Sequence, residues 1–299
     1  MASASRMNRS TRQWKVGLYV AGVVSAAWLW FWILKLGLVR GDWVAITVLM
    51  WIPGLLSILF RVVFKEGFSD VGLRVGKAQF WLWAYLGPLA LGSISIVLGL
   101  LFGRATLTPH LRDQAMLEAV FFKLSWLMHD SSTDGLLWQR FLSVALIGIV
   151  PGFFCAFGEE LGWRGYLLPR LMQAGWPYPL VLSGLVWGIW HFPFIILTGY
   201  AHGAVALSLL MFTLATVLFG VFIGWLRLAS GSVWVAAMAH ASFNAFVQSF
   251  FGASFDADRA WFWIGDYGVL TLLPYGLLVA WLYWSRRVHV ALAGNAVTS

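Results

Sequence analysis

Long apolar runs recur along the whole sequence, and they restrict the folds open to this chain more than any other feature. A helix needs about 20 apolar residues to cross the hydrocarbon core of a bilayer, which is about 30 Å thick. Eight such runs are present, at residues 16–34, 43–60, 80–102, 141–157, 179–197, 205–226, 233–251 and 261–284. The composition agrees, because 61% of the 299 residues are hydrophobic and only 11% are charged. The runs therefore predict about eight membrane spans.

The secondary structure of these spans follows from the bilayer itself. The hydrocarbon core holds no water, so a spanning segment must pair its own backbone groups, either as a helix or in a closed barrel. Barrel strands show about ten residues of alternating apolar and polar character, and this sequence lacks that pattern. We therefore predict an all-α fold, a polytopic transmembrane helical bundle, with residues 1–299 forming a single membrane-embedded domain.

The basic residues indicate the orientation of the bundle. If residues 1–15 form a basic cytoplasmic tail, the same side holds 13 of the 20 Lys and Arg, namely Arg6, Arg9, Arg12, Lys15, Arg61, Lys65, Arg74, Lys77, Arg164, Arg170, Arg227, Arg286 and Arg287. Loops rich in Lys and Arg stay in the cytoplasm, and an even number of spans places both termini there. We expect an integral protein of a bacterial cytoplasmic membrane, with a membrane-lipid partner and no nucleic-acid partner.

Two of the loops between the predicted spans have sequence patterns of their own. The loop at 103–140 faces the other side of the membrane, and within it residues 115–128 have the pattern of an interfacial helix. The loop at 61–79 is short, basic and punctuated by glycine, and we expect it to contact the membrane surface. Cys155 is the only cysteine, so the sequence offers no intramolecular disulfide and no Cys-based zinc cluster.

Ionisable side chains at membrane depth are costly, so each one is a candidate functional residue. The first group lies in GEELGWRGYLLPRL, where Glu159 and Glu160 directly follow an apolar run. On a helix Glu160 and Arg164 share a face in the order that favours an ion pair, whereas Glu159 points about 100° away. Two adjacent carboxylates in a low dielectric should titrate separately, which suits one of them to general-base work. The alternative is that these residues end a helix at the membrane surface.

Two further groups lie inside apolar runs. His191 stands in LVWGIWHFPFII, and Pro193 frees the carbonyl of Ile189, which predicts a kink beside the imidazole. His240 and Asn244, in MAHASFNAF, are four residues apart and project from one face of the seventh run. Taken singly, His191 could be a hydrogen-bonded core residue, and the pair could simply bridge helices.

Taken together, the three groups place two carboxylates, two imidazoles and an amide on three spans. These side chains supply a base, proton carriers and donors for an oxyanion, and water-mediated hydrolysis of a peptide bond needs groups of these kinds. A proton-coupled transporter is an alternative, because buried Glu and His also form proton relays. The sequence shows no inverted repeat or matched pair of broken helices to favour transport. A non-catalytic immunity or scaffold protein of the same fold is the third hypothesis.

The three motifs also resemble a known family. They read E-E-x-x-x-R, aromatic-x-x-x-H and H-x-x-x-N, at Glu159, Glu160, Arg164, Trp187, His191, His240 and Asn244. This pattern is similar to that of the CPBP family, the CAAX proteases and bacteriocin-processing or Abi proteins, which includes the type II CAAX prenyl endopeptidases. The resemblance covers about 141–251, the expected catalytic helical core. At Trp187 the family more often has Phe, and we expect either ring to serve as an aromatic wall.

The resemblance implies a role for each matching residue. Glu159 would activate water, and His191 would assist the proton transfer. His240 and Asn244 would stabilise the oxyanion. Arg164 and Glu160 would support the residues that contact substrate. The implied substrate is a hydrophobic or lipidated peptide, cleaved by an intramembrane endopeptidase near the cytoplasmic leaflet.

A metal ion is the main alternative within this hypothesis. Two His and one or two Glu could bind zinc and leave a position open for water. The sequence has no H-E-x-x-H motif, however, and Asn244 is a poor zinc ligand. Members of the family resemble glutamate-dependent enzymes that need no metal. We therefore expect no obligatory cofactor, with a divalent metal such as zinc left open.

Overall fold

The computed structural model describes residues 8–39, 42–106, 141–201, 203–252 and 261–296. Every regular element in these ranges is a helix, and the one β-bridge there, between Leu73 and Ser232, is isolated. The N-terminal helices are α1 (Arg9–Lys35), α2 (Asp42–Val63) and α3 (Ala78–Leu101). The predicted all-α fold is confirmed. Residues 115–128, where we predicted an interfacial helix, lie outside the described residues.

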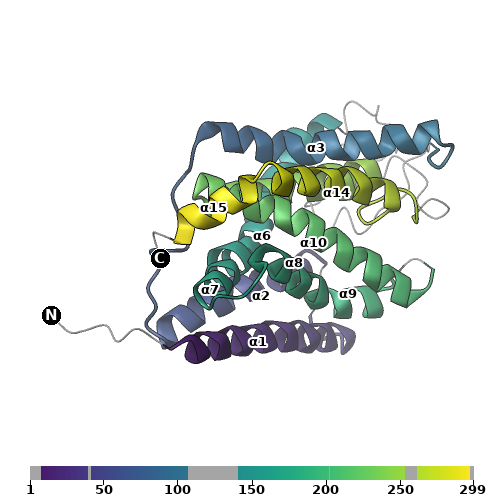
Figure 1. Cartoon of the computed structure of the whole chain (residues 1–299). Helices are drawn as coiled ribbons and strands as arrows, with labels where there is room; N and C mark the ends of the chain where they lie inside the picture. The colour runs from purple at the N-terminus through teal and green to yellow at the C-terminus, as the bar shows by residue number, and fades with distance from the viewer. Residues whose placement is uncertain (1–7, 40–41, 107–140, 202, 253–260, 297–299) are drawn as a thin grey trace.

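The second half of the chain supplies the core of the bundle. Its described helices are α6 (Ile149–Gly162), α7 (Leu168–Gln173), α8 (Pro179–Trp190), α9 (Phe192–Leu197), α10 (Val205–Ser230), α11 (Val233–Ser242), α14 (Val269–Trp284) and α15 (Arg287–Ala296). Three π-helical segments continue them: η2 (Ser143–Gly148) and η3 (Trp163–Leu167) flank α6, and η4 (Phe243–Phe251) extends α11. Figure 1 shows α1 along one side of the bundle and α3 and α14 along the other, with α8 and α10 between them.

Six of the described helical stretches are long and apolar enough to cross a membrane. They are Arg9–Lys35, Val44–Val63, Ala78–Leu101, Ser143–Gln173, Pro179–Leu197 and Val205–Ser230. They coincide with the first six predicted runs. The seventh run forms α11 and η4, and the eighth forms the shorter apolar helix α14, which begins at Val269 because residues 261–268 are turns. The chain is an integral membrane protein built as a helical bundle.

The fourth run differs from its predicted end at residue 157. The helical stretch continues to Gln173, so that both carboxylates and Arg164 lie inside it and are buried. The alternative that these residues end a helix at the membrane surface is therefore wrong. Counting apolar residues stops at the first charge, whereas the helix continues because the charges pair within the bundle rather than reaching water.

Close glycine contacts bring the helices of this region together. On α8, a methyl group at Gly184 would lie 2.9 Å from the carbonyl oxygen of Thr216 on α10. On α6, a methyl group at Gly162 would lie 2.4 Å from Cβ of Pro53 on α2. Small residues at such crossings let helix backbones approach closely where lipid supplies no hydrophobic driving force. The glycine on α8 thus lets the fifth span approach the sixth closely.

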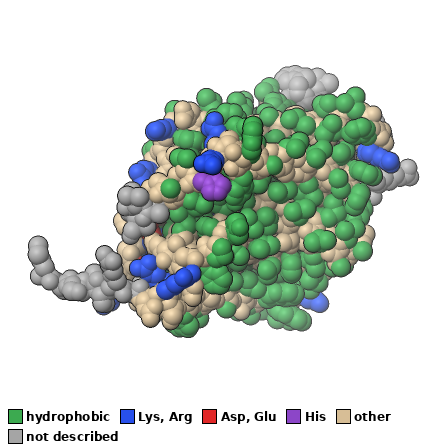
Figure 2. Space-filling view, viewed as in Figure 1, with side chains coloured by type: hydrophobic (Ala, Val, Ile, Leu, Met, Phe, Trp, Pro, Cys, Tyr) green, Lys and Arg blue, Asp and Glu red, His purple; other side chains and the backbone are tan. Residues whose placement is uncertain are grey.

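The surface of the bundle is apolar, as expected for a protein surrounded by lipid. Large apolar side chains such as Leu29, Trp83 and Leu210 are more than half exposed. Figure 2 shows apolar side chains covering most of one face, with several Lys and Arg gathered toward the end where α1 begins and α15 ends. A continuous exposed apolar surface of this kind marks contact with lipid.

Candidate active site

The predicted ion pair between Glu160 and Arg164 is present and completely buried. Arg164 Nη1 donates to Glu160 Oε1 over 2.9 Å, and both side chains are 0% exposed. His240 Nδ1, on α11, lies 2.9 Å from the same oxygen. A buried charge is tolerated when it is paired and hydrogen-bonded. The three residues form a buried charged group that joins α6, η3 and α11.

Glu159 has a different set of partners from those of its neighbour. Its Oε2 accepts hydrogen bonds from two indole groups, Trp187 Nε1 at 2.7 Å and Trp163 Nε1 at 3.2 Å. The side chain is buried on α6 and points toward α8. The two carboxylates therefore point to different partners, as the helix geometry predicted. The sequence analysis did not identify the two indoles as the donors to Glu159. Trp163 is four residues beyond Glu159, a spacing that could have predicted its contact.

His191 lies where the fifth span is interrupted. It caps α8, and α9 begins at the next residue, as expected from the position of Pro193. Its Nδ1 lies 2.9 Å from the carbonyl oxygen of Trp187. A carbonyl oxygen can only accept a hydrogen bond, so Nδ1 carries a proton. Nε2 is then the nitrogen left to bind or transfer a proton.

Asn244 lies on the same continuous helix as His240. It is buried in η4, and its own backbone carbonyl accepts a hydrogen bond from Ser249. Its side-chain amide makes no hydrogen bond with any other described residue. The structure thus brings the carboxylates, Arg164, Trp187 and His240 into contact, whereas Asn244 makes no hydrogen bond to either carboxylate within the described residues.

One oxygen of each of the two carboxylates that a metal ion could use is already engaged by other residues. Within the described ranges there is no group of three or more His, Cys, Asp or Glu that could hold one. Glu159 Oε2 is shared by two N–H donors, and Glu160 Oε1 is shared by Arg164 and His240. A catalytic zinc site takes three protein ligands that converge on one point, and the described residues hold no such group of His, Cys, Asp or Glu.

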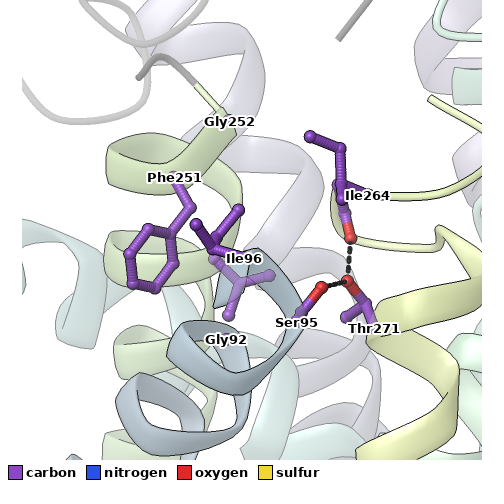
Figure 3. Close-up of a pocket in the computed structure, with 9 residues that line it drawn as sticks. Gly92, Ser95, Ile96, Phe251, Gly252, Ile264 and Thr271 are labelled. Atoms are coloured by element: carbon purple, nitrogen blue, oxygen red, sulfur yellow. Dashed lines mark hydrogen bonds between the residues drawn. The ribbon is translucent and has the colours of Figure 1, made fainter. Parts of the chain in front are cut away.

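A small pocket lies apart from these residues. It is bounded by α3, η4, α14 and the turn before α14, and the side chains of Ser95 and Thr271 meet in it over 2.7 Å (Figure 3). Thr271 also donates to the carbonyl of Gly265 over 2.6 Å. None of the nine residues that line the pocket is ionisable, and none belongs to the group around Glu159.

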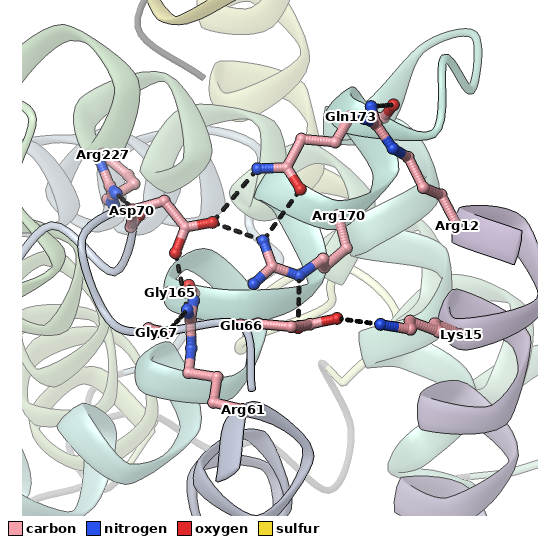
Figure 4. Close-up of polar contacts among 10 residues, drawn as sticks. All are labelled: Arg12, Lys15, Arg61, Glu66, Gly67, Asp70, Gly165, Arg170, Gln173 and Arg227. Carbon is pink, nitrogen blue, oxygen red and sulfur yellow. Dashed lines mark hydrogen bonds and ion pairs between the residues drawn. The ribbon is translucent and has the colours of Figure 1, made fainter. Parts of the chain in front are cut away.

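A second, partly buried cluster of charges lies beside the site, and the sequence analysis did not predict it. Glu66 accepts from Lys15 and from Arg170, each over 2.9 Å. Asp70 accepts from Arg61 over 2.7 Å and also pairs with Arg170 (Figure 4). The loop at 61–79, expected to contact the membrane surface, thus directs two carboxylates into the protein. Burial opposes ionisation of both, but the neighbouring cations hold the pKa of Glu66 and of Asp70 below their usual values.

Arg61 connects this charge cluster to the backbone of the site. Its guanidinium is 1% exposed and donates to the carbonyl of Gly165 over 2.7 Å. Gly165 belongs to η3 and directly follows Arg164. The cluster of Lys15, Arg61, Glu66, Asp70 and Arg170 therefore holds the helical turn that carries the E-E-x-x-x-R motif.

Comparison with known protein families gives a match to part of the chain. Residues 139–246 match the family described as type II CAAX prenyl endopeptidase Rce1-like. This segment is therefore similar to CAAX proteases. The CAAX protease segment contains every predicted site residue: Glu159, Glu160, Arg164, Trp187, His191, His240 and Asn244. No curated protein matches the chain. The resemblance drawn from the three motifs is confirmed, and the family is one of proteases.

Proposed function

We propose that this protein is an intramembrane endopeptidase in which Glu159 activates a water molecule to hydrolyse a peptide bond. The observation that carries the proposal is the position of Glu159. Its carboxylate is buried inside the membrane bundle, is held by two indole N–H groups and lies in a segment of a protease family. A carboxylate at membrane depth with fixed neutral donors is suited to general-base work.

The reaction can be written with the groups at hand. Glu159 takes a proton from water as the water oxygen attacks the peptide carbonyl carbon, which leaves negative charge on the carbonyl oxygen. Glu159 then gives this proton to Nε2 of His191, which delivers it to the amide nitrogen as the C–N bond breaks, releasing an acid and an amine. Its Nδ1–H bond to the carbonyl of Trp187 keeps Nε2 available.

His240 and Asn244 supply donors for the oxyanion in this scheme. Glu160 accepts the Nδ1–H of His240 and so fixes the orientation of the His240 imidazole. Its Nε2–H and the amide of Asn244 can then donate to the oxyanion. Arg164 holds Glu160 in place through their ion pair, and Glu160 in turn holds His240.

The substrate class follows from where the site lies. The carboxylates are buried in a helical stretch that is long and apolar enough to cross a membrane, which favours a substrate that reaches them from the membrane. We propose a hydrophobic or lipidated peptide, cleaved near the cytoplasmic leaflet, with both termini of the enzyme in the cytoplasm. The gathering of basic side chains at the end where α1 begins supports this orientation.

The test compares wild-type protein with Glu159→Gln in proteoliposomes. The probe is a farnesylated peptide ending in a CAAX sequence, and the same peptide without the lipid is the second substrate. We expect Glu159→Gln to lose at least about 10²-fold in cleavage rate, because glutamine cannot accept the proton. If neither peptide is cleaved, membranes of cells carrying each protein are compared by mass spectrometry for new peptide termini. Cleavage by Glu159→Gln at the wild-type rate would refute the mechanism.

A further inference from the structure

Trp187 occupies the centre of the candidate site, where sequence analysis predicted only an aromatic wall. Its side chain is 4% exposed. The ring lies 4.7 Å from the guanidinium carbon of Arg164 and 5.1 Å, between centroids, from the imidazole of His240. Its indole nitrogen donates to Glu159 over 2.7 Å. A phenylalanine would retain the wall and lose this donor.

The hydrogen bond from Trp187 is the shorter of the two that Glu159 receives. A bond of 2.7 Å between N–H and a carboxylate lies at the short end of the charge-assisted range, whereas the bond from Trp163 is 3.2 Å long. Burial strengthens such a bond, because water does not compete for the acceptor. Of the two tryptophans, Trp187 therefore has the stronger hold on the carboxylate.

Both indoles donate to the same oxygen, Oε2, which determines what the other oxygen can do. Oε1 of Glu159 accepts no hydrogen bond from any described residue. The donors fix the rotation of the carboxylate and leave the lone pairs of Oε1 free to accept a proton. The geometry thus separates the two oxygens into one that is held and one that can react.

Trp187 also fixes the imidazole beside it. Its backbone carbonyl accepts from His191 Nδ1 over 2.9 Å, which determines the tautomer of that histidine. The side chain of one residue therefore orients the carboxylate, and its backbone orients the proton carrier. Trp187 is held in turn on α8, where the glycines at 184 and 188 pack against α10.

We propose that Trp187 is a positioning residue, whose indole N–H directs Oε1 of Glu159 toward water and whose replacement by phenylalanine slows the chemical step. This inference rests on the proposed function, in which Glu159 is the base. An orienting hydrogen bond acts on the chemical step rather than on substrate binding. The expected signature is a fall in kcat with KM unchanged.

The test uses Trp187→Phe with Trp51→Phe as its matched control. The indole N–H of Trp51 is also buried but has no acceptor among the described residues, and its ring packs on Gly158, next to Glu159. We expect Trp187→Phe to lower kcat about tenfold to a hundredfold, the factor that corresponds to one hydrogen bond to a charged group. Trp51→Phe removes a buried indole of the same kind and should leave kcat unchanged.

A spectroscopic measurement tests the contact without relying on activity. In protein labelled with ¹⁵N-tryptophan, the indole resonance of Trp187 is identified by its absence in Trp187→Phe. That resonance should move upfield in Glu159→Gln, because a neutral amide oxygen is a weaker acceptor than a carboxylate. The resonance of Trp51 should stay in place.

Three results would overturn the inference. They are wild-type kcat in Trp187→Phe, an equal loss of kcat in Trp51→Phe, and a Trp187 resonance that does not respond to Glu159→Gln. Failure of the proposed function gives a different result, since Glu159→Gln would then cleave the peptide at the wild-type rate.

Discussion

Replacing Arg61 with methionine tests whether the second charge cluster stabilises the fold. Methionine retains most of the aliphatic stem and removes the guanidinium, which donates to Gly165, Gly67 and Asp70. The change leaves a buried carbonyl at Gly165 without its donor from Arg61. It also removes one of the two cations beside Asp70, while Arg170 remains.

The magnitude follows from the burial of each acceptor. A buried acceptor that loses its only side-chain donor costs about 1–3 kcal/mol, which applies to Gly165. Asp70 is 26% exposed and keeps its ion pair with Arg170, so losing its ion pair with Arg61 costs about 1 kcal/mol. The Gly67 bond is partly buried and adds a similar amount. We therefore expect Arg61→Met to lower the free energy of unfolding by about 3–5 kcal/mol, the usual range for breaking a buried ion pair.

The assay is unfolding in mixed micelles by increasing SDS, followed by far-ultraviolet circular dichroism. The matched control is Arg74→Met, because Arg74 comes from the same loop but is exposed and donates only to the carbonyl of Gly231. The control should change the free energy of unfolding by less than about 1 kcal/mol. An unfolding curve for Arg61→Met that overlays that of Arg74→Met would refute the reasoning.

Two further predictions concern the same fold. Because the pKa values of Glu66 and Asp70 are held low in the folded protein, their contribution is present above about pH 4 and should be lost as pH falls through the folded pKa values. SDS unfolding between pH 6 and pH 3 should show this loss, and a Glu66→Gln, Asp70→Asn variant that retained the same pH dependence would contradict it. At the α8–α10 crossing, Gly184→Ala should destabilise the protein by about 1–3 kcal/mol through overpacking against Thr216. Gly22→Ala, on α1 with open space around it, is the matched control, and equal unfolding midpoints for the two variants would exclude the predicted contact.

The membrane fold could be predicted from the sequence because the bilayer dictates it locally. Each span is long, apolar and helical for reasons that act within one segment, so run lengths located the first six spans. The end of the fourth span could not be located in this way. Whether the helix passes beyond residue 157 depends on partners such as His240, which is 80 positions from Glu160.

The candidate site shows the same division between local and distant contacts. The pair of Glu160 and Arg164 was predictable, since both lie on one helix at a spacing that brings side chains together. The donation from Trp187 to Glu159 joins residues 28 positions apart and depends on how α8 rotates against α6. An apolar pattern does not determine that rotation when a helix is apolar on every side.

The two charge clusters share one short stretch of backbone, and this explains why a loop outside the match with the protease family bears on the site. Glu160 and Arg164 are desolvated in the bundle, where their burial is unfavourable unless the pair is held in good geometry. Arg61 holds the next residue, Gly165, from a position 104 residues away in sequence. Arg61 is in turn held by Asp70, and Asp70 by Arg170, which lies one and a half turns beyond Arg164 on the same helical stretch. Arg61 at the end of the second span and the loop that follows it thus contact the helical stretch at Gly165 and at Arg170, through bonds and ion pairs that lie outside the three motifs.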